Sequence, residues 1–201
     1  MKRYVAALMV LLPCLAAVPP IDKNKTLGVA TAPVQIEIFS DFTCPHCKAL
    51  HETVLPQLMK DYVNAGKVYI IDRSFPLGGG PGSGHEHSRE AFEYAVASAR
   101  VGKYQAVADT LYAQQNSWAM TGNIAGALSG VLTPTEMKKV QSLLKDHDVQ
   151  SEIDKEYQEG IETGINETPT LVVTVGGKRY PLPHAPDYRL MKSMIDGFLP
   201  K

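Results

Sequence analysis

The chain has 201 residues, of which 44% are hydrophobic and 20% charged, a composition ordinary for a globular protein that buries a core. Its 20 Lys and Arg residues nearly balance its 21 Asp and Glu residues, so the formal net charge is −1. This balance gives no reason to expect nucleic acid or an anionic surface as a partner, and the length predicts one domain with room for an insertion.

The first 18 residues have the pattern of an export signal. A basic start at Lys2 and Arg3 precedes an apolar stretch that closes with small residues. The stretch is shorter than the ~20 residues that span a bilayer, and Pro13 interrupts it. We therefore interpret residues 1–18 as a signal peptide and expect a soluble mature chain in the periplasm or another space outside the cytoplasm.

Cys14 lies in this leader, where a cysteine can be a lipid attachment site. Pro13 precedes it, whereas such sites normally have a small residue there, so lipidation is the weaker alternative. If Cys14 leaves with the leader, the mature chain keeps only Cys44 and Cys47. A disulfide across two intervening residues closes almost no loop and adds little stability, so this pair predicts a bond that is made and broken.

The elements that follow form a β-α-β unit. Residues 19–32 show no sustained periodicity and are interpreted as a linker or an extended arm that leads into the fold. Alternating β-branched residues predict a strand over 34–39, helical spacing predicts a helix over 45–64, and a second strand covers 67–73. Because a helix connects the strands, they should be parallel. Pro56 lies inside the helix and is expected to kink it.

A long helical segment follows a glycine-rich loop at 76–84. Residues 85–164 are almost continuously compatible with helix, with breaks near Gly102, 120–123 and 132–134. We expect four or five helices packed as a small subdomain.

The C-terminal part predicts a hairpin and a helix. Strand character at 170–175 and 178–182 flanks Gly176-Gly177, and a last helix covers about 186–199. The order β-α-β, helical block, β-β-α predicts an α/β thioredoxin fold, residues 33–201, with a helical insertion at about 85–164.

The motif Cys44-Pro45-His46-Cys47 carries the expected chemistry. Cys44 lies at a helix start, where unpaired N–H groups and the helix dipole favour a thiolate, so it should be the attacking sulfur. Cys47, one turn further in, resolves the mixed disulfide. Pro45 and His46 are expected to tune the pair, Pro45 by setting the first turn and His46 by adding positive charge or an N–H donor.

A zinc site and a c-type haem are weaker interpretations of this motif than thiol–disulfide chemistry. A zinc site would need His51, His85 or His87 at spacings unsuited to a tetrahedral site, and Lys48 stands where a c-type haem needs His. We expect no metal and no other cofactor. The three histidines are interpreted as surface or packing residues of helices.

From about Gly28 to the C-terminus, the chain resembles the DsbA-like branch of the thioredoxin superfamily. The shared segments are Ala32-Pro33-Val34, Phe39-Ser40-Asp41-Phe42, the CPHC motif, Arg73-Ser74-Phe75-Pro76-Leu77 and Gly164-Ile165-Asn166-Glu167-Thr168-Pro169-Thr170. The resemblance implies that Pro169 is cis and faces Cys44 and Cys47, and that the backbone of Thr168 binds an extended substrate peptide by strand addition.

Two positions depart from the family pattern. Many relatives have a buried carboxylate six residues before the first cysteine, but here that position is Ile38, and Glu37 should point to the opposite face. Thr168 is found in related isomerases and reductases, whereas the best-known oxidases have another residue there.

The leading hypothesis is an exported, monomeric oxidase that passes the Cys44–Cys47 disulfide to cysteine-containing exported proteins. The resemblance implies reoxidation by a DsbB-like, quinone-linked membrane protein. The alternatives are a reductase or isomerase kept in the dithiol form, and a chaperone-like peptide binder.

Overall fold

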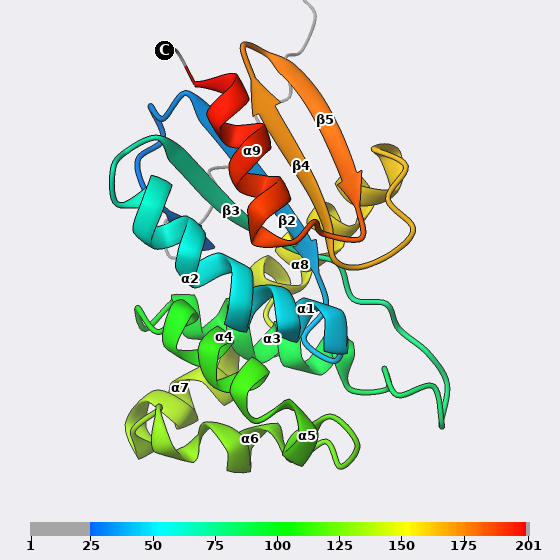
Figure 1. The fold of residues 1–201 in the computed structure, drawn as a ribbon. Coiled ribbons are helices and arrows are strands. Elements are labelled where there is room, and N and C mark those ends of the chain that lie inside the picture. The colour runs from blue at the N-terminus through cyan, green and yellow to red at the C-terminus, as the bar shows by residue number, and fades with distance from the viewer. Residues whose placement is uncertain (1–24, 200–201) are drawn as a thin grey trace, which may run out of the picture.

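The computed structural model describes residues 25–199 and contains a five-stranded sheet of order β1-β3-β2-β4-β5 (Figure 1). The strands are β1 (Thr26–Leu27), β2 (Val34–Ser40), β3 (Val68–Ser74), β4 (Thr170–Val175) and β5 (Lys178–Pro183). β2 and β3 are parallel, and the other three pairings are antiparallel. The predicted β-α-β unit, the C-terminal hairpin and the α/β thioredoxin fold are confirmed.

A continuous helical run connects β2 to β3. It consists of α1 (Pro45–Ala49), a π-helical turn η2 (Leu50–Val54), α2 (Leu55–Leu58) and a second π-helical turn η3 (Met59–Val63). Proline has no N–H, and in a regular α-helix its ring clashes with the carbonyl one turn earlier. A π-helical turn directly precedes the turn that contains Pro56, so the irregularity expected at this proline takes the form of a wider turn.

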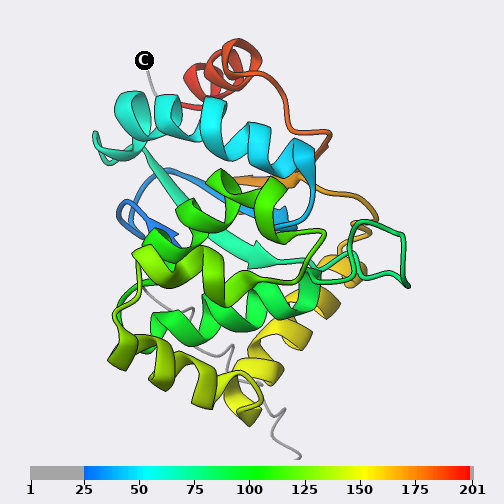
Figure 2. The same cartoon turned by 90° about the horizontal axis from the view of Figure 1, so that it is seen from below.

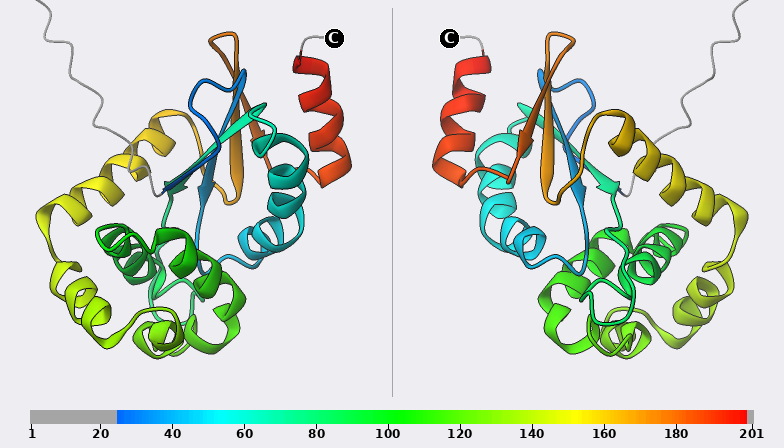
Figure 3. Two further views of the ribbon diagram at one scale, coloured as in Figure 1. Left: turned by 90° about the vertical axis from the view of Figure 1, so that its left-hand side faces the viewer. Right: turned by 90° about the vertical axis from the view of Figure 1, so that its right-hand side faces the viewer.

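Helices cover both faces of the sheet (Figure 3). Successive residues of a strand point to opposite faces. Ile38 packs with residues of the helical run and of α9 (Tyr188–Phe198), while its neighbour Phe39 packs on the other face near Tyr157 of α8 (His147–Glu162). α8 lies close to the sheet because residue 160 is glycine, and a Cβ there would be 2.6 Å from the ring of Phe75.

The helical block lies below the sheet in Figure 1 and is seen from below in Figure 2. Before α8 it contains α3 (Ser88–Ala99), α4 (Tyr104–Ala113), α5 (Gln115–Trp118), α6 (Ile124–Ala127), a 3₁₀ turn η4 (Leu128–Gly130) and α7 (Pro134–Leu143). The expected number of four or five helices was wrong, because α3 to α8 make six. Two of the breaks carry no Gly or Pro: one at Gln114, and one at Asp146, whose side chain caps α8.

Part of the predicted linker belongs to the sheet. Thr26 of β1 pairs with Ile71 of β3, and the preceding Lys25 is fully buried. The Lys25 ammonium donates to the carboxylates of Glu152, at 3.1 Å, and Glu156. This segment is therefore part of the folded domain and not a linker, since the carboxylates that pair with Lys25 lie more than a hundred positions away on α8.

The predicted signal peptide and Cys14 lie outside the described residues. Within residues 25–199, no helix is long and apolar enough to cross a membrane.

Replacing Lys25 with Ala should destabilise the protein by about 3–5 kcal/mol, because the Glu156 carboxylate would stay buried without its nearest cationic partner, and Arg73 lies farther away at 3.6 Å. Lys48→Ala, which breaks a partly exposed pair with Glu52, should cost less than about 1 kcal/mol. Chemical denaturation of both variants measures the difference, and equal losses would contradict the structural role of Lys25.

Candidate active site

Cys44 and Cys47 lie where β2 meets the helical run. Cys44 is the N-cap residue of α1, with extended backbone angles of φ −77° and ψ 121°, and Pro45 occupies the first turn. Both cysteines are free thiols, with 5% and 1% of their surface exposed, whereas Pro45 and His46 between them are exposed. The attacking position predicted for Cys44 therefore coincides with a helix start, and Cys47 lies beneath it.

Asp41 holds the loop before Cys44. Its carboxylate is fully buried and accepts hydrogen bonds from the backbone N–H of Thr43 at 2.6 Å, the N–H of Leu77 at 2.6 Å and the hydroxyl of Ser88. These donors belong to three separate segments: the active-site loop, the loop after β3, and α3. One side chain thus ties the reactive loop to the sheet and to the helical block.

Gln115 of α5 holds the same loop from another direction. Its side-chain amide donates to the carbonyl of Phe42 at 2.8 Å and to that of Cys44 at 3.1 Å. Sequence reasoning assigned no role to Gln115 and noted Asp41 only as part of a motif. The position of Asp41, a carboxylate directly after a predicted strand and three residues before Cys44, is a sequence signal for a role at the site. No local pattern marks Gln115.

The loop before β4 lies against the cysteine pair. The Thr168–Pro169 peptide bond is cis, as the resemblance implied, and the Cys44 thiol donates to the Thr168 carbonyl at 3.5 Å. The Thr168 hydroxyl is buried and has no hydrogen-bond partner among the described residues. Cys44 and Thr168, which lie more than 120 positions apart in the sequence, are therefore in contact, as the resemblance implied.

The surroundings of Cys44 favour its thiolate. A hydrogen bond from the Cys47 thiol is the largest cause, and together with the backbone N–H groups of Cys47 and His46 it lowers the pKa of Cys44 to about 5 against the opposing effect of burial. The helix start predicted such a shift, and the thiol of Cys47 is its largest source.

Cys47 has the opposite character. Burial, followed by its hydrogen bond to Cys44 and the charge of that thiolate, raises its pKa well above the ordinary value. The backbone N–H of Asp41 donates to its sulfur at 3.3 Å. At neutral pH, Cys44 is therefore the thiol that ionises and Cys47 keeps its proton.

A groove of about 530 Å³ opens beside the pair. It runs between the helical run and the segment that connects β5 to α9, and its lining includes His46, Thr53, Thr168, Pro169, His184 and Tyr188. His46 and the Thr168–Pro169 loop thus border both the reactive sulfur and a space of a size suited to an extended peptide.

The other residues singled out from the sequence lie apart from the sulfurs. Glu37 points away from Ile38, as expected, and its carboxylate pairs with Arg73 at 2.7 Å and Arg179 at 2.8 Å. His85 hydrogen-bonds the hydroxyl of Thr43 at 2.6 Å and so supports the active-site loop. Within the described residues, no cluster of three or more His, Cys, Asp or Glu side chains could hold a metal ion.

His51 and His87 each contact an acidic residue nearby. His51 hydrogen-bonds Asp109 at 2.8 Å and packs on Tyr112, and His87 lies 3.5 Å from Glu90.

A pair of cysteines at a helix start, one with a stabilised thiolate and one protonated, set against a cis-proline loop in this fold, defines a thiol–disulfide oxidoreductase. The family model described as Thioredoxin matches residues 22–196. The chain belongs to the thioredoxin family.

Similar proteins agree with this class. Disulfide bond formation protein D of Bacillus subtilis is 27% identical over 166 residues, which cover 77% of this chain and 69% of the relative. A protein of Bacillus cereus with the same designation, qualified as probable, is 24% identical over 182 residues, covering 89% and 80%. Among solved structures, alpha-DsbA1 of Wolbachia pipientis has a TM-score of 0.71 at 20% identity, with 89% of this chain and 92% of that one covered.

The ultraviolet absorbance of the thiolate should titrate with a midpoint near pH 5. Cys47→Ser keeps a hydrogen-bond donor and should leave the midpoint within about one unit, whereas Cys47→Ala removes the donor and should raise it by more than that. Cys44→Ala should abolish the acidic transition. Equal midpoints in the two Cys47 variants would contradict the hydrogen bond as the main cause.

Proposed function

We propose that this chain is an exported dithiol oxidase that transfers the Cys44–Cys47 disulfide to cysteines of other proteins. A substrate thiolate attacks Cys44, the Cys44–Cys47 bond breaks, and Cys47 leaves and takes up a proton. A second substrate thiolate then attacks the substrate sulfur of the mixed disulfide and releases Cys44 as a thiolate. The substrate gains a disulfide, and the pair is reduced by two electrons.

The stabilised Cys44 thiolate is the observation that carries the oxidase direction. Hydrogen bonds that lower the pKa of Cys44 to about 5 stabilise the reduced protein and have no counterpart in the disulfide. Each ~1.4 kcal/mol of such stabilisation raises the reduction potential of a two-electron couple by ~30 mV. A lower pKa therefore makes the disulfide a stronger oxidant.

The groove supports a polypeptide substrate. It adjoins Cys44 through His46, and Thr168 and Pro169 form its other side. We assign Thr168 and Pro169 to substrate binding by strand addition, with Cys44 and Cys47 as the catalytic pair and Pro45 and His46 as residues that tune it. The partners proposed are cysteine-containing exported proteins and a quinone-linked membrane protein that restores the disulfide.

The proposed place of action is outside the cytoplasm, in keeping with the leader pattern of residues 1–18 and with a pair that needs an oxidising space. The second candidate is a reductase or isomerase. Thr168 favours it, because this residue directly contacts Cys44 and the family resemblance associates Thr at this position with isomerases and reductases.

Oxidised protein should speed the refolding of a reduced, cysteine-containing substrate protein, and Cys44→Ala should abolish this effect because no attackable disulfide remains. The rate at which the substrate protein regains its activity measures the effect on refolding. A reduction potential as low as that of a cytoplasmic thioredoxin, about −270 mV, would exclude the oxidase direction.

The stability of the reduced protein relative to the oxidised protein should depend on pH. The folded pKa of Cys44 is lowered from 9.0 to about 5, so its stabilisation is fully present above pH 9 and is lost as the pH falls through 5. Between pH 5 and pH 7 the free energy of unfolding of the reduced protein should rise by about 2 kcal/mol relative to that of the oxidised protein. Denaturation of both forms at each pH measures this, and a constant difference would contradict the proposal.

A further inference from the structure

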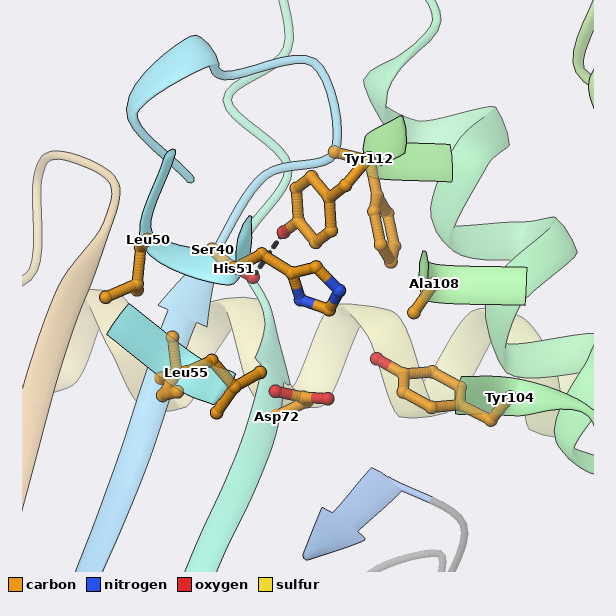
Figure 4. Close-up of a pocket in the computed structure, with 10 residues that line it drawn as sticks. Ser40, Leu50, His51, Leu55, Asp72, Tyr104, Ala108 and Tyr112 are labelled. Carbon is orange, nitrogen blue, oxygen red and sulfur yellow. Dashed lines mark hydrogen bonds between the residues drawn. The ribbon is translucent and has the colours of Figure 1, made fainter. Parts of the chain in front are cut away.

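A small cavity lies between the helical run and the helical block, on the sheet face that carries Ile38 (Figure 4). Its volume of about 20 Å³ is enough for one water molecule. The polar side chains that line it are Ser40, His51, Asp72, Tyr104 and Tyr112. The exchange described above uses none of these residues.

Asp72 is the acidic member of this group. It lies on β3 directly opposite Ile38 of β2, so its carboxylate replaces, from the neighbouring strand, the one absent at position 38. The amide of Gln105 donates to it at a long 3.5 Å. Burial raises the pKa of Asp72 to about 6, against the opposing charges of His51 and Lys25. At neutral pH it is thus an anion that accepts a proton readily.

The other groups that face Asp72 come from several elements. His51 belongs to η2, Tyr104 to α4 and Glu156 to α8, and Lys25 precedes β1. Figure 4 shows the His51 ring between Tyr112 and the Asp72 carboxylate. The Nε2 atom of His51 is engaged with Asp109, which does not line the cavity.

The opposite end of the cavity reaches the surroundings of Cys47. The hydroxyl of Tyr112 donates to that of Ser40 at 3.1 Å, and the residue after Ser40 donates its N–H to the Cys47 sulfur. Phe42, which also lines the cavity, packs in the same cluster as Cys47. Tyr112 and Cys47 belong to the same buried cluster, and after burial the charge of Cys47 is the next cause that raises the pKa of Tyr112.

Cys47 needs a proton acceptor. It is 1% exposed and its pKa lies well above neutrality, yet it must become a thiolate to resolve a mixed disulfide on Cys44. Bulk water reaches its sulfur poorly, and the Asp41 carboxylate already accepts hydrogen bonds from the N–H and hydroxyl of Thr43, the N–H of Leu77 and the hydroxyl of Ser88.

We propose that Asp72 accepts the Cys47 proton through the hydroxyls of Ser40 and Tyr112 and water in this cavity, and returns it when the disulfide is reduced. This inference rests on the proposed exchange at Cys44 and Cys47. The Cys47 thiol gives up its proton, its thiolate attacks Cys44, the substrate sulfur leaves as a thiolate, and Asp72 holds the proton until it reaches solvent. Asp72 touches neither sulfur. It is a positioning residue, because it acts on Cys47 only through the hydroxyls and water that carry the proton.

The test uses reduced protein carrying Cys14→Ser and an excess of a nitroaromatic disulfide that releases a coloured thiolate. Attack by Cys44 releases a first equivalent and leaves a mixed disulfide, and attack by Cys47 releases a second equivalent as the Cys44–Cys47 bond forms. Stopped-flow absorbance separates the two phases, so each cysteine is followed by itself.

Asp72→Asn should slow the second phase by about tenfold or more at pH 7 and remove its change near pH 6, while the first phase stays within about twofold. Asp109→Asn, which alters a carboxylate beside His51 but outside the cavity, should change neither phase by more than about twofold. Ile38→Glu combined with Asp72→Asn returns a carboxylate to the cavity and should restore most of the lost rate.

A second phase with unchanged rate and pH profile in Asp72→Asn would overturn the relay, as would equal slowing in Asp109→Asn. Loss of the first phase in the otherwise unaltered protein would instead overturn the proposed exchange at Cys44. Thermal unfolding of each variant, followed by circular dichroism, verifies that it is folded.

Discussion

The chemistry of this protein depends on the hydrogen bonds that the Cys44 sulfur receives at the start of the helical run. The Cys47 thiol and the N–H groups of His46 and Cys47 all converge on it. A thiolate is stable there because these donors are already in place when the charge forms, so little reorganisation is needed. The same arrangement keeps Cys47 protonated, and the two sulfurs acquire opposite roles from one geometry.

This geometry in turn requires the loop before Cys44 to be held from outside. Asp41 and Gln115 supply that hold, one by gathering donors from the loop after β3 and from α3, the other by donating to two loop carbonyls from α5. The helical insertion is therefore part of the active site. Without it, the turn that presents Cys44 would lose the hydrogen bonds to Ser88 and Gln115 and would keep those to Leu77 and Thr168.

The core beneath the pair contains a cavity with polar walls for a related reason. A protonated Cys47 in an apolar core would have no route for its proton, and the cost of an unpaired charge there would be high. A cavity lined by hydroxyls and by Asp72 offers such a route while the sheet around it stays packed. Because Ile38 and Asp72 are paired across β2 and β3, the position of an acid in this site is a property of the sheet and not of one strand.

The sequence by itself determined what is local: four of the five strands in their chain order, the helix that begins at the CxxC motif, and the direction of the Cys44 pKa shift, although the largest source of that shift is the Cys47 thiol. Side-chain periodicity and chain order carry this information within a few turns. Only the tertiary structure decided that Lys25 is buried on α8, that Gln115 reaches the Cys44 carbonyl and that Asp72 shares a cavity with His51. These contacts join segments tens to more than a hundred residues apart, and no local pattern specifies which distant side chain will fill a given buried position.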